Sequence, residues 1–325
     1  MNLLVSFHTE ADQRKIFNEG LKSSYTISYL EDAANRSEAI KNADVILAWN
    51  PRLEFSSEEY PLFSRVRLMQ LFSAGGDHLP DELFKMNFDV AGNVGAYAGP
   101  MAEHVLAMVL ALAKDLKGGY LKLKAGNFDQ FSPNRSINGA NVAILGLGGI
   151  GKASARLFKA FGANIFAINT SGRTDEKVDF IGTVDDLQYV LSQADIIVIS
   201  MALSNVTQNL IGERELSWMK PNAILVNVAR GEIIDQRAFY EFLKSHPDFR
   251  AGIDAWWVEP FRHGRFEMGY PFLDLPNVIG TPHNSGMVPD AMTNAARVVV
   301  ASLKAYAAGE PVKGILKKEE YAEIH

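Results

Sequence analysis

The chain has 325 residues, of which 47% are apolar and 22% are charged, and it carries a formal net charge of −6. This length exceeds what one hydrophobic core usually holds, so we expect two globular domains. The mild negative charge, without a basic stripe, argues against nucleic acid as a partner, and the lack of cysteine excludes disulfides and thiolate metal sites.

Short apolar strands alternate with amphipathic helices through the first part of the chain. Strands are expected at 3–7, 25–29, 45–49, 68–72 and 90–93, and helices at 11–19, 31–41 and 80–86. This alternation predicts a parallel sheet with helices on both faces, whose ligands lie beyond the carboxyl ends of the strands. Residues 49–52, 73–77 and 93–97 occupy those ends, although their glycine, proline and asparagine are also typical of ordinary turns.

A long apolar helix is predicted at 100–116, with proline at its first position and few polar residues on any face. A helix with this composition is expected to be buried. Glu103 and His104 near its start are interpreted as a structural pair at least as readily as a catalytic one.

A strand, helix, strand unit of about thirty residues follows. Its strands are expected at 142–145 and 164–168, and each is short and apolar like a buried parallel strand. The helix between them is predicted to have one apolar face made of Ala153, Leu157, Phe158 and Phe161.

The turn between the first strand and this helix carries the pattern G-x-G-x-x-G. Its first glycine permits a tight turn, its second lets a pyrophosphate approach the backbone, and its third lets the helix pack close to the strand. Free N–H groups at the helix start then face the phosphates. We therefore predict a dinucleotide site, the alternative being a glycine-rich turn without a ligand. Its phosphate-binding residues are Gly146, Gly148, Gly149, Ile150 and Gly151.

The end of the second strand of this unit distinguishes the two nicotinamide cofactors. An NAD site usually has an Asp or Glu there for the ribose 2′-hydroxyl, whereas this chain has Asn169. Neutral groups on Asn169, Thr170 and Ser171, together with the guanidinium of Arg173, suit a 2′-phosphate better. We therefore predict NADP(H) over NAD(H). In the alternative, Arg173 is only a solvated charge and the carboxylate at 175 or 176 reaches the ribose.

The alternation of strands and helices resumes after this unit. Strands are expected at 196–200, 224–228, 251–253 and 278–281, and helices at 184–191, 213–219, 236–243 and 289–307. These elements predict a second doubly wound sheet over roughly 99–287. Because the last helix follows all the strands of that sheet, we expect it to return to the first domain.

Three stretches fall just after strands of the second sheet, where a nicotinamide would lie. They are 227–231 with a guanidinium, 254–260 with carboxylates and 281–284 with an imidazole. Hydride transfer between a nicotinamide and a hydroxyl or carbonyl carbon needs a general acid/base, a group that tunes it and a cation for an anionic substrate. The residues therefore predict an oxidoreductase.

The motifs GLGGIG, NVARGEIID, DAWWVEP and TPHNSG, in this order and spacing, resemble the D-isomer-specific 2-hydroxyacid dehydrogenase family. Its members include glyoxylate/hydroxypyruvate reductases, glycerate dehydrogenases and D-lactate dehydrogenases. The resemblance extends over nearly the whole chain. We expect two doubly wound, parallel-sheet α/β domains: a flavodoxin-like substrate domain of residues 1–98 plus 288–325, and a Rossmann cofactor domain of residues 99–287.

The resemblance also implies roles for polar residues after the strands. Arg230 looks like the arginine that holds the substrate carboxylate, His283 like the acid/base, and Glu259 like the carboxylate that pairs with it. Each has a plainer interpretation, as a strand cap, an ordinary histidine and a surface carboxylate respectively. Asp254 looks like the family residue that binds the nicotinamide amide, and Ala74, Gly75 and Gly76 look like the loop that binds the substrate carboxylate. From their places after strands, Ala229 is assigned to the cofactor and Arg52 to the substrate.

The sequence departs from the family around Glu259. Residues 261–270 form a longer stretch than most members have there, and two tryptophans, Trp256 and Trp257, precede the glutamate. Large aromatic side chains would narrow a pocket, and the arginines of the insertion would meet a second anionic group. The alternative is that the insertion is a surface or dimer loop.

From these residues and this resemblance we predict a cytoplasmic enzyme without a metal site, and the resemblance alone implies a homodimer. It would reduce a small 2-keto acid, glyoxylate or hydroxypyruvate, to the D-2-hydroxy acid with NADP(H). Neither nucleic acid nor a membrane is an expected partner. Two alternatives stay open: a dinucleotide-sensing regulatory protein of the same fold, and a dehydrogenase of this family that uses NAD and another acid.

Overall fold

The computed structural model describes residues 1–321 and consists of two compact units. The first unit comprises Met1–Tyr97 together with the chain from Val288 onward, and the second comprises Ala98–Met287. The first boundary differs by one residue from the predicted division after residue 98, whereas the functions assigned to the two domains stay predictions.

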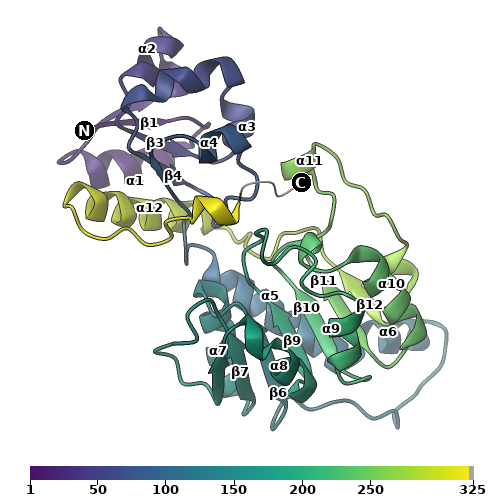
Figure 1. The fold of residues 1–325 in the computed structure, drawn as a ribbon. Helices are drawn as coiled ribbons and strands as arrows, with labels where there is room; N and C mark the ends of the chain where they lie inside the picture. Colours follow the sequence, from purple (N-terminus) through teal and green to yellow (C-terminus); the bar gives the residue numbers. More distant parts are fainter. Residues whose placement is uncertain (322–325) are drawn as a thin grey trace. The chain divides into compact units, whose positions relative to one another are not determined.

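The first unit is built on a parallel sheet of five strands in the order β2-β1-β3-β4-β5, of which Figure 1 labels β1, β3 and β4. Its strands are β1 (Asn2–Val5), β2 (Thr26–Tyr29), β3 (Val45–Ala48), β4 (Leu68–Leu71) and β5 (Asp89–Ala91). Every residue of β3 and β4 is buried, as in a parallel sheet covered on both faces. The strand order is that of flavodoxin-like folds, so the predicted fold of this part is confirmed.

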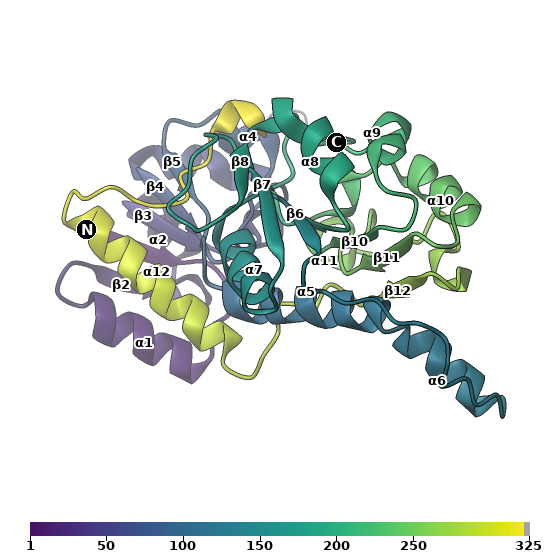
Figure 2. The same ribbon diagram turned by 90° about the horizontal axis from the view of Figure 1, so that it is seen from below.

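The helices of the first unit are α1 (Ala11–Leu21), α2 (Arg36–Lys41), α3 (Pro51–Glu54), α4 (Asp81–Phe84) and α12 (Ala291–Ala307). Helix α12 packs beside α1, as Figures 1 and 2 show, and its buried side chains join the core formed by the strands. Gly20 permits this close approach, since a Cβ there would lie 2.6 Å from Cγ1 of Val300. The expected return of the last helix to the first domain is therefore confirmed.

The helix predicted at 31–41 is wrong in its first half. Residues Leu30–Asp32 form a single 3-10 turn, and α2 begins only at Arg36. The side chain of Asn35 accepts a hydrogen bond from the N–H of Glu38 at 3.1 Å and so caps the helix at that point.

The second unit is built on a parallel sheet of seven strands in the order β12-β11-β10-β9-β6-β7-β8. Its strands are β6 (Asn141–Leu145), β7 (Asn164–Ile168), β8 (Phe180–Gly182), β9 (Ile196–Ile199), β10 (Ile224–Asn227), β11 (Arg250–Ile253) and β12 (Val278–Gly280). The chain moves outward from β6 to β8, returns to β9 beside β6 and moves outward again to β12. This is the Rossmann order with one further strand. Strand β8 was not predicted, since its three residues are short of a full apolar run and the first two are only half-buried.

The helices of the second unit are α5 (Ala98–Ala113), α6 (Leu116–Lys124), α7 (Gly149–Ala160), α8 (Leu187–Gln193), α9 (Glu213–Trp218), α10 (Gln236–Ser245) and α11 (Pro260–His263). Helices α5 and α7 pack against each other beside the sheet (Figure 2). Of the predicted face of α7, Phe158 is buried and Ala153 and Leu157 are half-buried, whereas Phe161 is 43% exposed. The residues of α7 that are buried are mainly small: Gly151, Ser154, Ala155 and Phe158.

The helix predicted at 100–116 is α5, which ends three residues earlier, and a further helix that was not predicted follows it. Helix α5 ends at Ala113, Asp115 has a left-handed backbone conformation with φ 48°, and α6 begins at Leu116. No residue of α6 is buried. Large apolar side chains on this helix and after it are exposed, namely Leu116, Tyr120, Leu121, Leu123, Phe128 and Phe131. We call residues 116–131 the α6 arm.

Candidate active site

The glycine fingerprint has the geometry of a phosphate-binding turn. Gly146 has φ 100°, and a Cβ there would lie 2.5 Å from the backbone nitrogen of Met201. A Cβ at Gly151 would lie 2.2 Å from the carbonyl oxygen of Gly146, so this glycine lets α7 pack against the turn. At Gly148, which caps α7, an added Cβ meets nothing within 4 Å. The second glycine therefore faces open space at the helix start, which fits the pyrophosphate of a dinucleotide.

Asn169 orders the loop that follows β7. Its Oδ1 accepts hydrogen bonds from the N–H groups of Ser171 at 3.0 Å and Gly172 at 2.7 Å. Its Nδ2 donates to the carbonyl oxygen of Arg173 at 2.8 Å, and Arg173 itself is exposed. The carboxamide at the predicted ribose position thus holds a loop that ends in a solvent-exposed guanidinium.

The two carboxylates that follow Arg173 bond to cations of helix α7. Lys152 pairs with Asp175, and Arg156 pairs with Glu176. The hydrogen bond from the Lys152 ammonium holds the pKa of the Asp175 carboxyl below its ordinary value. These contacts argue against the alternative in which one of the two carboxylates binds the ribose.

A buried asparagine shapes the loop that carries Arg230. Asn227 is 1% exposed, its Oδ1 accepts from the N–H of Ala229 at 3.0 Å, and its Nδ2 donates to the carbonyl oxygen of Arg230 at 2.8 Å. Gly231 brings this loop against the loop after β11, since a Cβ there would lie 2.4 Å from the carbonyl carbon of Trp256. Asn227 follows the pattern of an Asx turn, a signal that the sequence contains and that the prediction did not use.

His283 and Glu259 form a close hydrogen-bonded pair within the second unit. Nδ1 of His283 lies 2.6 Å from Oε2 of Glu259, and the other carboxylate oxygen accepts from the N–H of Trp256 at 2.6 Å. The N–H of Glu259 donates to Nδ1 of His263 at 3.0 Å, which anchors its backbone as well. The His283 side chain is 30% exposed, against 9% for that of Glu259. With Nδ1 held by the carboxylate, Nε2 is the ring nitrogen that can exchange a proton with a substrate.

His283 also has an unusual backbone conformation. Its φ is 50°, in the left-handed region that residues other than glycine seldom adopt. Such a conformation costs about 1–3 kcal/mol, is maintained by the surrounding contacts and is most common at functional sites. The wholly buried Asp254 supplies one of these contacts, since its Oδ1 accepts from Oγ1 of Thr281 at 2.6 Å.

The two tryptophans before Glu259 belong to the core of the second unit. Trp256 is 5% and Trp257 is 9% exposed. Their indole N–H groups donate to the carbonyl oxygens of Thr281 and Ile234, each at 2.8 Å, and Trp257 stacks on Phe272. The rings therefore pack within the unit, in place of the pocket-narrowing role predicted for them.

The insertion at 261–270 is tied to the loop after β10. Arg262 bonds to Glu232, and the two side chains are only 13% and 18% exposed. Arg265 pairs with Glu267 at 3.1 Å. Both arginines thus have carboxylate partners in the unit, which argues against the predicted contact with a second anionic group.

The predicted substrate residues of the first unit lie after β4 and in α3. Arg52 and Ala74 are exposed, Gly75 is half-buried and Gly76 is buried. The turn that carries Arg52 is held by the carboxylate of Glu54, which accepts from the N–H of Trp49 at 3.0 Å and whose pKa is raised by burial. These residues belong to a different unit from His283, and their roles stay predictions.

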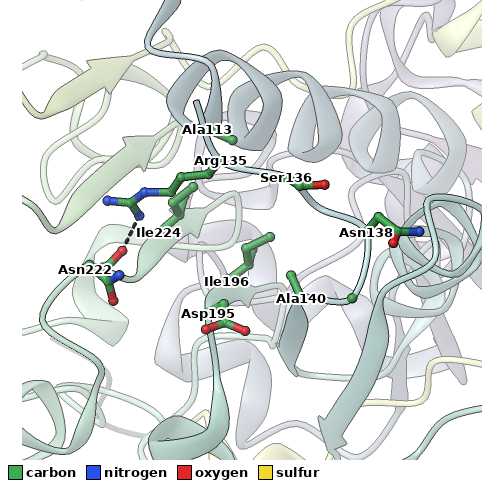
Figure 3. A pocket seen from close by; sticks show the side chains of 10 residues that line it. Ala113, Arg135, Ser136, Asn138, Ala140, Asp195, Ile196, Asn222 and Ile224 are labelled. Atoms are coloured by element: carbon green, nitrogen blue, oxygen red, sulfur yellow. Dashed lines mark hydrogen bonds between the residues drawn. The ribbon is translucent and has the colours of Figure 1, made fainter. Parts of the chain in front are cut away.

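A cavity of about 280 Å³ lies at the amino ends of strands of the second unit (Figure 3). It is lined by Ala113, Arg135, Ser136, Asn138, Gly139, Ala140, Asp195, Ile196, Asn222 and Ile224. Arg135 donates hydrogen bonds to the carbonyl oxygens of Asn222 and Asp248. Because ligands of parallel sheets bind beyond the carboxyl ends of the strands, this cavity is not the candidate active site.

Two further findings concern the part of the chain that the structure describes, residues 1–321. There, no group of three or more His, Asp or Glu side chains is arranged to hold a metal ion. Over the same residues, no helix combines the length and the apolar character that crossing a membrane requires.

Comparison with known families identifies the family of the chain. Residues 106–285 match the family model described as the NAD binding domain of D-isomer specific 2-hydroxyacid dehydrogenases. The chain belongs to this family. It is accordingly an NAD(P)-dependent 2-hydroxyacid dehydrogenase, as the four motifs predicted.

Three curated relatives are similar to this dehydrogenase over most of its length. A D-3-phosphoglycerate dehydrogenase of Methanocaldococcus jannaschii is 29% identical over 86% of this chain, which spans only 52% of that protein. A glyoxylate reductase of Pyrococcus furiosus is 26% identical, over 87% of this chain and 84% of the relative. A glycerate dehydrogenase of Methylorubrum extorquens is 30% identical, over 76% of this chain and 77% of the relative.

A solved structure supports the fold of this dehydrogenase. D-lactate dehydrogenase from Aquifex aeolicus, in complex with NAD and lactic acid, is 26% identical and has a TM-score of 0.72. The similarity covers 95% of this chain and 96% of that one. The prediction of two parallel-sheet α/β domains is therefore confirmed.

Proposed function

We propose that this dehydrogenase reduces a small 2-keto acid to its D-2-hydroxy acid, with His283 as the acid/base. The observation that carries the proposal is the 2.6 Å hydrogen bond between Nδ1 of His283 and Glu259, which leaves Nε2 for the substrate oxygen. Arg230 follows β10, the neighbour of the strand before Glu259, and its planar guanidinium suits a carboxylate. A 2-keto acid has both groups, a carbonyl oxygen that takes a proton and a carboxylate that needs a cation.

Two sets of residues are proposed to hold the reactants. Those for the dinucleotide are Gly146, Gly148, Gly149, Ile150 and Gly151 at the phosphates, Asn169, Thr170, Ser171 and Arg173 at the ribose, and Ala229 and Asp254 at the nicotinamide. Those for the substrate are Arg230 and, in the first unit, Arg52, Ala74, Gly75 and Gly76. A nicotinamide cofactor held by these residues would supply the hydride for reduction of the keto carbon.

The side chains of the second unit supply the proton and the electrostatic support. Nε2 of His283 donates its proton to the carbonyl oxygen as negative charge develops there. Glu259 orients the imidazole and stabilises its protonated form, and its own position is held by the N–H of Trp256. Arg230 binds the carboxylate so that the keto group lies near the histidine. In the reverse direction, His283 accepts the proton of the hydroxyl group.

Glyoxylate or hydroxypyruvate is the proposed substrate, since a glyoxylate reductase and a glycerate dehydrogenase are among the similar proteins. The test is the consumption of NADPH and of NADH, followed by absorbance, with glyoxylate, hydroxypyruvate, pyruvate and a bulky 2-keto acid. Faster turnover of glyoxylate or hydroxypyruvate than of the bulky acid would support the proposal. Fastest turnover of the bulky acid would reject the substrate. If both cofactors bind and neither is consumed, the reductase proposal fails, and the result favours the alternative of a dinucleotide-sensing regulatory protein.

We further propose that NADPH is the preferred cofactor. The strand that precedes the ribose position ends in Asn169, whose neutral side chain orders the loop and leaves the guanidinium of Arg173 exposed. The nearby carboxylates of Asp175 and Glu176 are paired with Lys152 and Arg156. Because these two carboxylates are already paired, the exposed guanidinium of Arg173 favours a 2′-phosphate over a 2′-hydroxyl at this position.

Replacing Arg173 by alanine is expected to weaken NADPH binding by about tenfold or more and NADH binding by less than about twofold, because only NADPH has a phosphate for the guanidinium. Fluorescence titration of each cofactor measures the two dissociation constants. Arg237→Ala, which removes an exposed arginine from α10, is the matched control. Equal weakening of both cofactors, or of neither, would contradict the NADPH preference.

We also propose that the enzyme is a homodimer whose α6 arm binds a second copy of the chain. Tyr120, Leu121 and Phe131 of the arm are 65%, 51% and 86% exposed, and a partner surface would remove them from water. The arm, residues 116–131, carries three lysines and one aspartate, whereas the whole chain has a net charge of −6. A basic, apolar arm is complementary in charge to the body of another copy.

Leu121→Glu is expected to convert a dimer into a monomer, because it places a charge in the apolar contact. Sedimentation velocity of the purified protein measures the change. Val184→Glu, at a residue that is 43% exposed elsewhere in the second unit, should leave the dimer intact. A parent protein that sediments as a monomer would refute the dimer. A cytoplasmic location is also part of the proposal, and fractionation of cells tests it.

A further inference from the structure

We propose that Asp254, Thr281 and His104 form a hydrogen-bonded chain that positions His283 for proton transfer. This inference rests on the proposed function, in which His283 is the acid/base. His283 has φ 50°, a conformation that residues other than glycine keep only where their surroundings hold them. The contacts of the loop around His283 are therefore part of how the acid/base is placed.

Asp254 binds this loop on both sides of His283. Its Oδ1 accepts from Oγ1 of Thr281 at 2.6 Å and from the N–H of Asn284 at 3.2 Å. Its Oδ2 accepts from the N–H of Ser285 at 3.4 Å. The aspartate is wholly buried, so water cannot replace these bonds when one of them is lost. One carboxylate thus restrains the residues before and after the strained histidine.

Thr281 connects Asp254 to helix α5. The hydroxyl proton of Thr281 is donated to Asp254, so its oxygen acts as the acceptor for Nε2 of His104, which lies 3.1 Å away. The backbone of Thr281 is held as well. Its N–H donates to the carbonyl oxygen of Ile253 at 2.9 Å, and its carbonyl oxygen accepts from the indole of Trp256 at 2.8 Å. His104 therefore donates a hydrogen bond to the hydroxyl of Thr281, which in turn donates one to the carboxylate of Asp254.

His104 provides the fixed end of this chain. It lies in the first half of α5, a helix that packs against β10, β11 and α7, and its side chain is 23% exposed. Its Nε2 is also 3.8 Å from Oδ1 of Asp254, which is close enough for a direct electrostatic contact. The resemblance gave Asp254 a role at the nicotinamide and gave His104 none. The geometry adds a positioning role for both, exerted through the loop of His283.

Thr281→Val removes only the hydroxyl group, whereas Thr281→Ser keeps it. We expect the valine variant to lower kcat by about tenfold or more, because it misplaces the acid/base. The KM of the keto acid and the Kd of the cofactor should change by less than about twofold, since neither is bound by Thr281. The serine variant should keep kcat within about threefold of the parent enzyme.

Changes at His104 test whether its effect passes through Thr281. His104→Leu removes the donor and should lower kcat, whereas His104→Gln keeps an N–H group and should restore most of it. In the Thr281→Val background, His104→Leu should cause no further loss, because the hydroxyl that links the two residues is already absent. Additive losses in the double variant would overturn the proposal.

A readout without turnover separates placement from chemistry. The Nδ1 proton of His283 can be observed by ¹H–¹⁵N NMR of the apoenzyme and identified by its loss in His283→Ala. We expect this resonance to shift or broaden in Thr281→Val and in His104→Leu, and to remain unchanged in Thr281→Ser. An unchanged resonance together with an unchanged kcat in Thr281→Val would overturn the proposal. Should that variant not fold, the Leu and Gln variants of His104 give the same test.

The failure of this proposal is distinct from the failure of the proposed function. If His283→Ala keeps full turnover, His283 is not the acid/base and the proposed function fails. If His283→Ala loses turnover while the variants of Thr281 and His104 keep it, the proposed function stands and only the positioning chain is refuted.

Discussion

Replacing His283 by alanine is expected to lower kcat for 2-keto acid reduction by at least about a hundredfold, the usual contribution of a positioned general acid. The variant lacks the ring whose Nδ1 lies 2.6 Å from Glu259, so no side chain at that position can protonate the developing alkoxide. Cofactor binding should change little, because the proposed phosphate and ribose contacts lie elsewhere. Steady-state kinetics and cofactor titration measure the two quantities.

His8→Ala is a suitable control, since the His8 side chain is 76% exposed and bonds to Glu31 in the first unit. It should keep the turnover of the parent enzyme. Turnover of His283→Ala within about threefold of the parent would remove the proposed role of the histidine. A large loss of cofactor affinity in the same variant would mean that the histidine also shapes the dinucleotide site.

Replacing Arg230 by alanine is expected to raise the KM of a 2-keto acid by about a hundredfold, because a charge-assisted pair of hydrogen bonds to the carboxylate is lost. An aldehyde of similar size without a carboxylate should be affected far less. Arg230→Lys should recover only part of the loss, since an ammonium lacks the planar fork of a guanidinium. The side chain of Asn227 bonds to the backbone of residues 229 and 230, so the loop keeps its shape when the arginine side chain is truncated.

Kinetics with both substrates on each variant test this assignment. Arg237→Ala again provides a control, because it removes an exposed arginine of the same unit. An equal rise in KM for the keto acid and for the aldehyde would mean that Arg230 does not bind the carboxylate. The role of its side chain would then be to stabilise the loop, through the hydrogen bond from Nη1 to the carbonyl oxygen of Ala229.

Most of the fold could be predicted because both sheets are parallel and their central strands are wholly apolar. The strands Val45–Ala48 and Ile196–Ile199 are buried along their whole length, so each is a continuous apolar run between amphipathic helices. Helix α6 could not be predicted in this way, because none of its residues is buried and its apolar side chains mark no core. The buried face of α7 was predicted only in part, because it also includes the small residues Gly151, Ser154 and Ala155, which an apolar pattern does not mark.

The candidate site could be located because each of its charged groups follows a strand of the second sheet, where ligands of such sheets bind. The bonds of Asp254 could not be predicted. They depend on the register of β11 and β12, which pairs Ile253 with Gly280 and so brings the next residues, Asp254 and Thr281, side by side. No local pattern indicates that register, the positive φ of His283 or the burial of Trp256 and Trp257, because all three depend on contacts between distant parts of the chain.

Because α12 belongs to the first unit, the two units can complete their folding only in a fixed order during translation. The core of the first unit includes α12, and the hydroxyl of Tyr25 donates to the carbonyl oxygen of Leu303 at 2.7 Å, 278 residues away in sequence. The second unit, Ala98–Met287, is one continuous stretch. A chain that leaves the ribosome from its N-terminus therefore releases the whole of the second unit before the first can close its core. The residues proposed for proton transfer are therefore synthesised before α12, the helix that the core of the first unit still lacks at that stage.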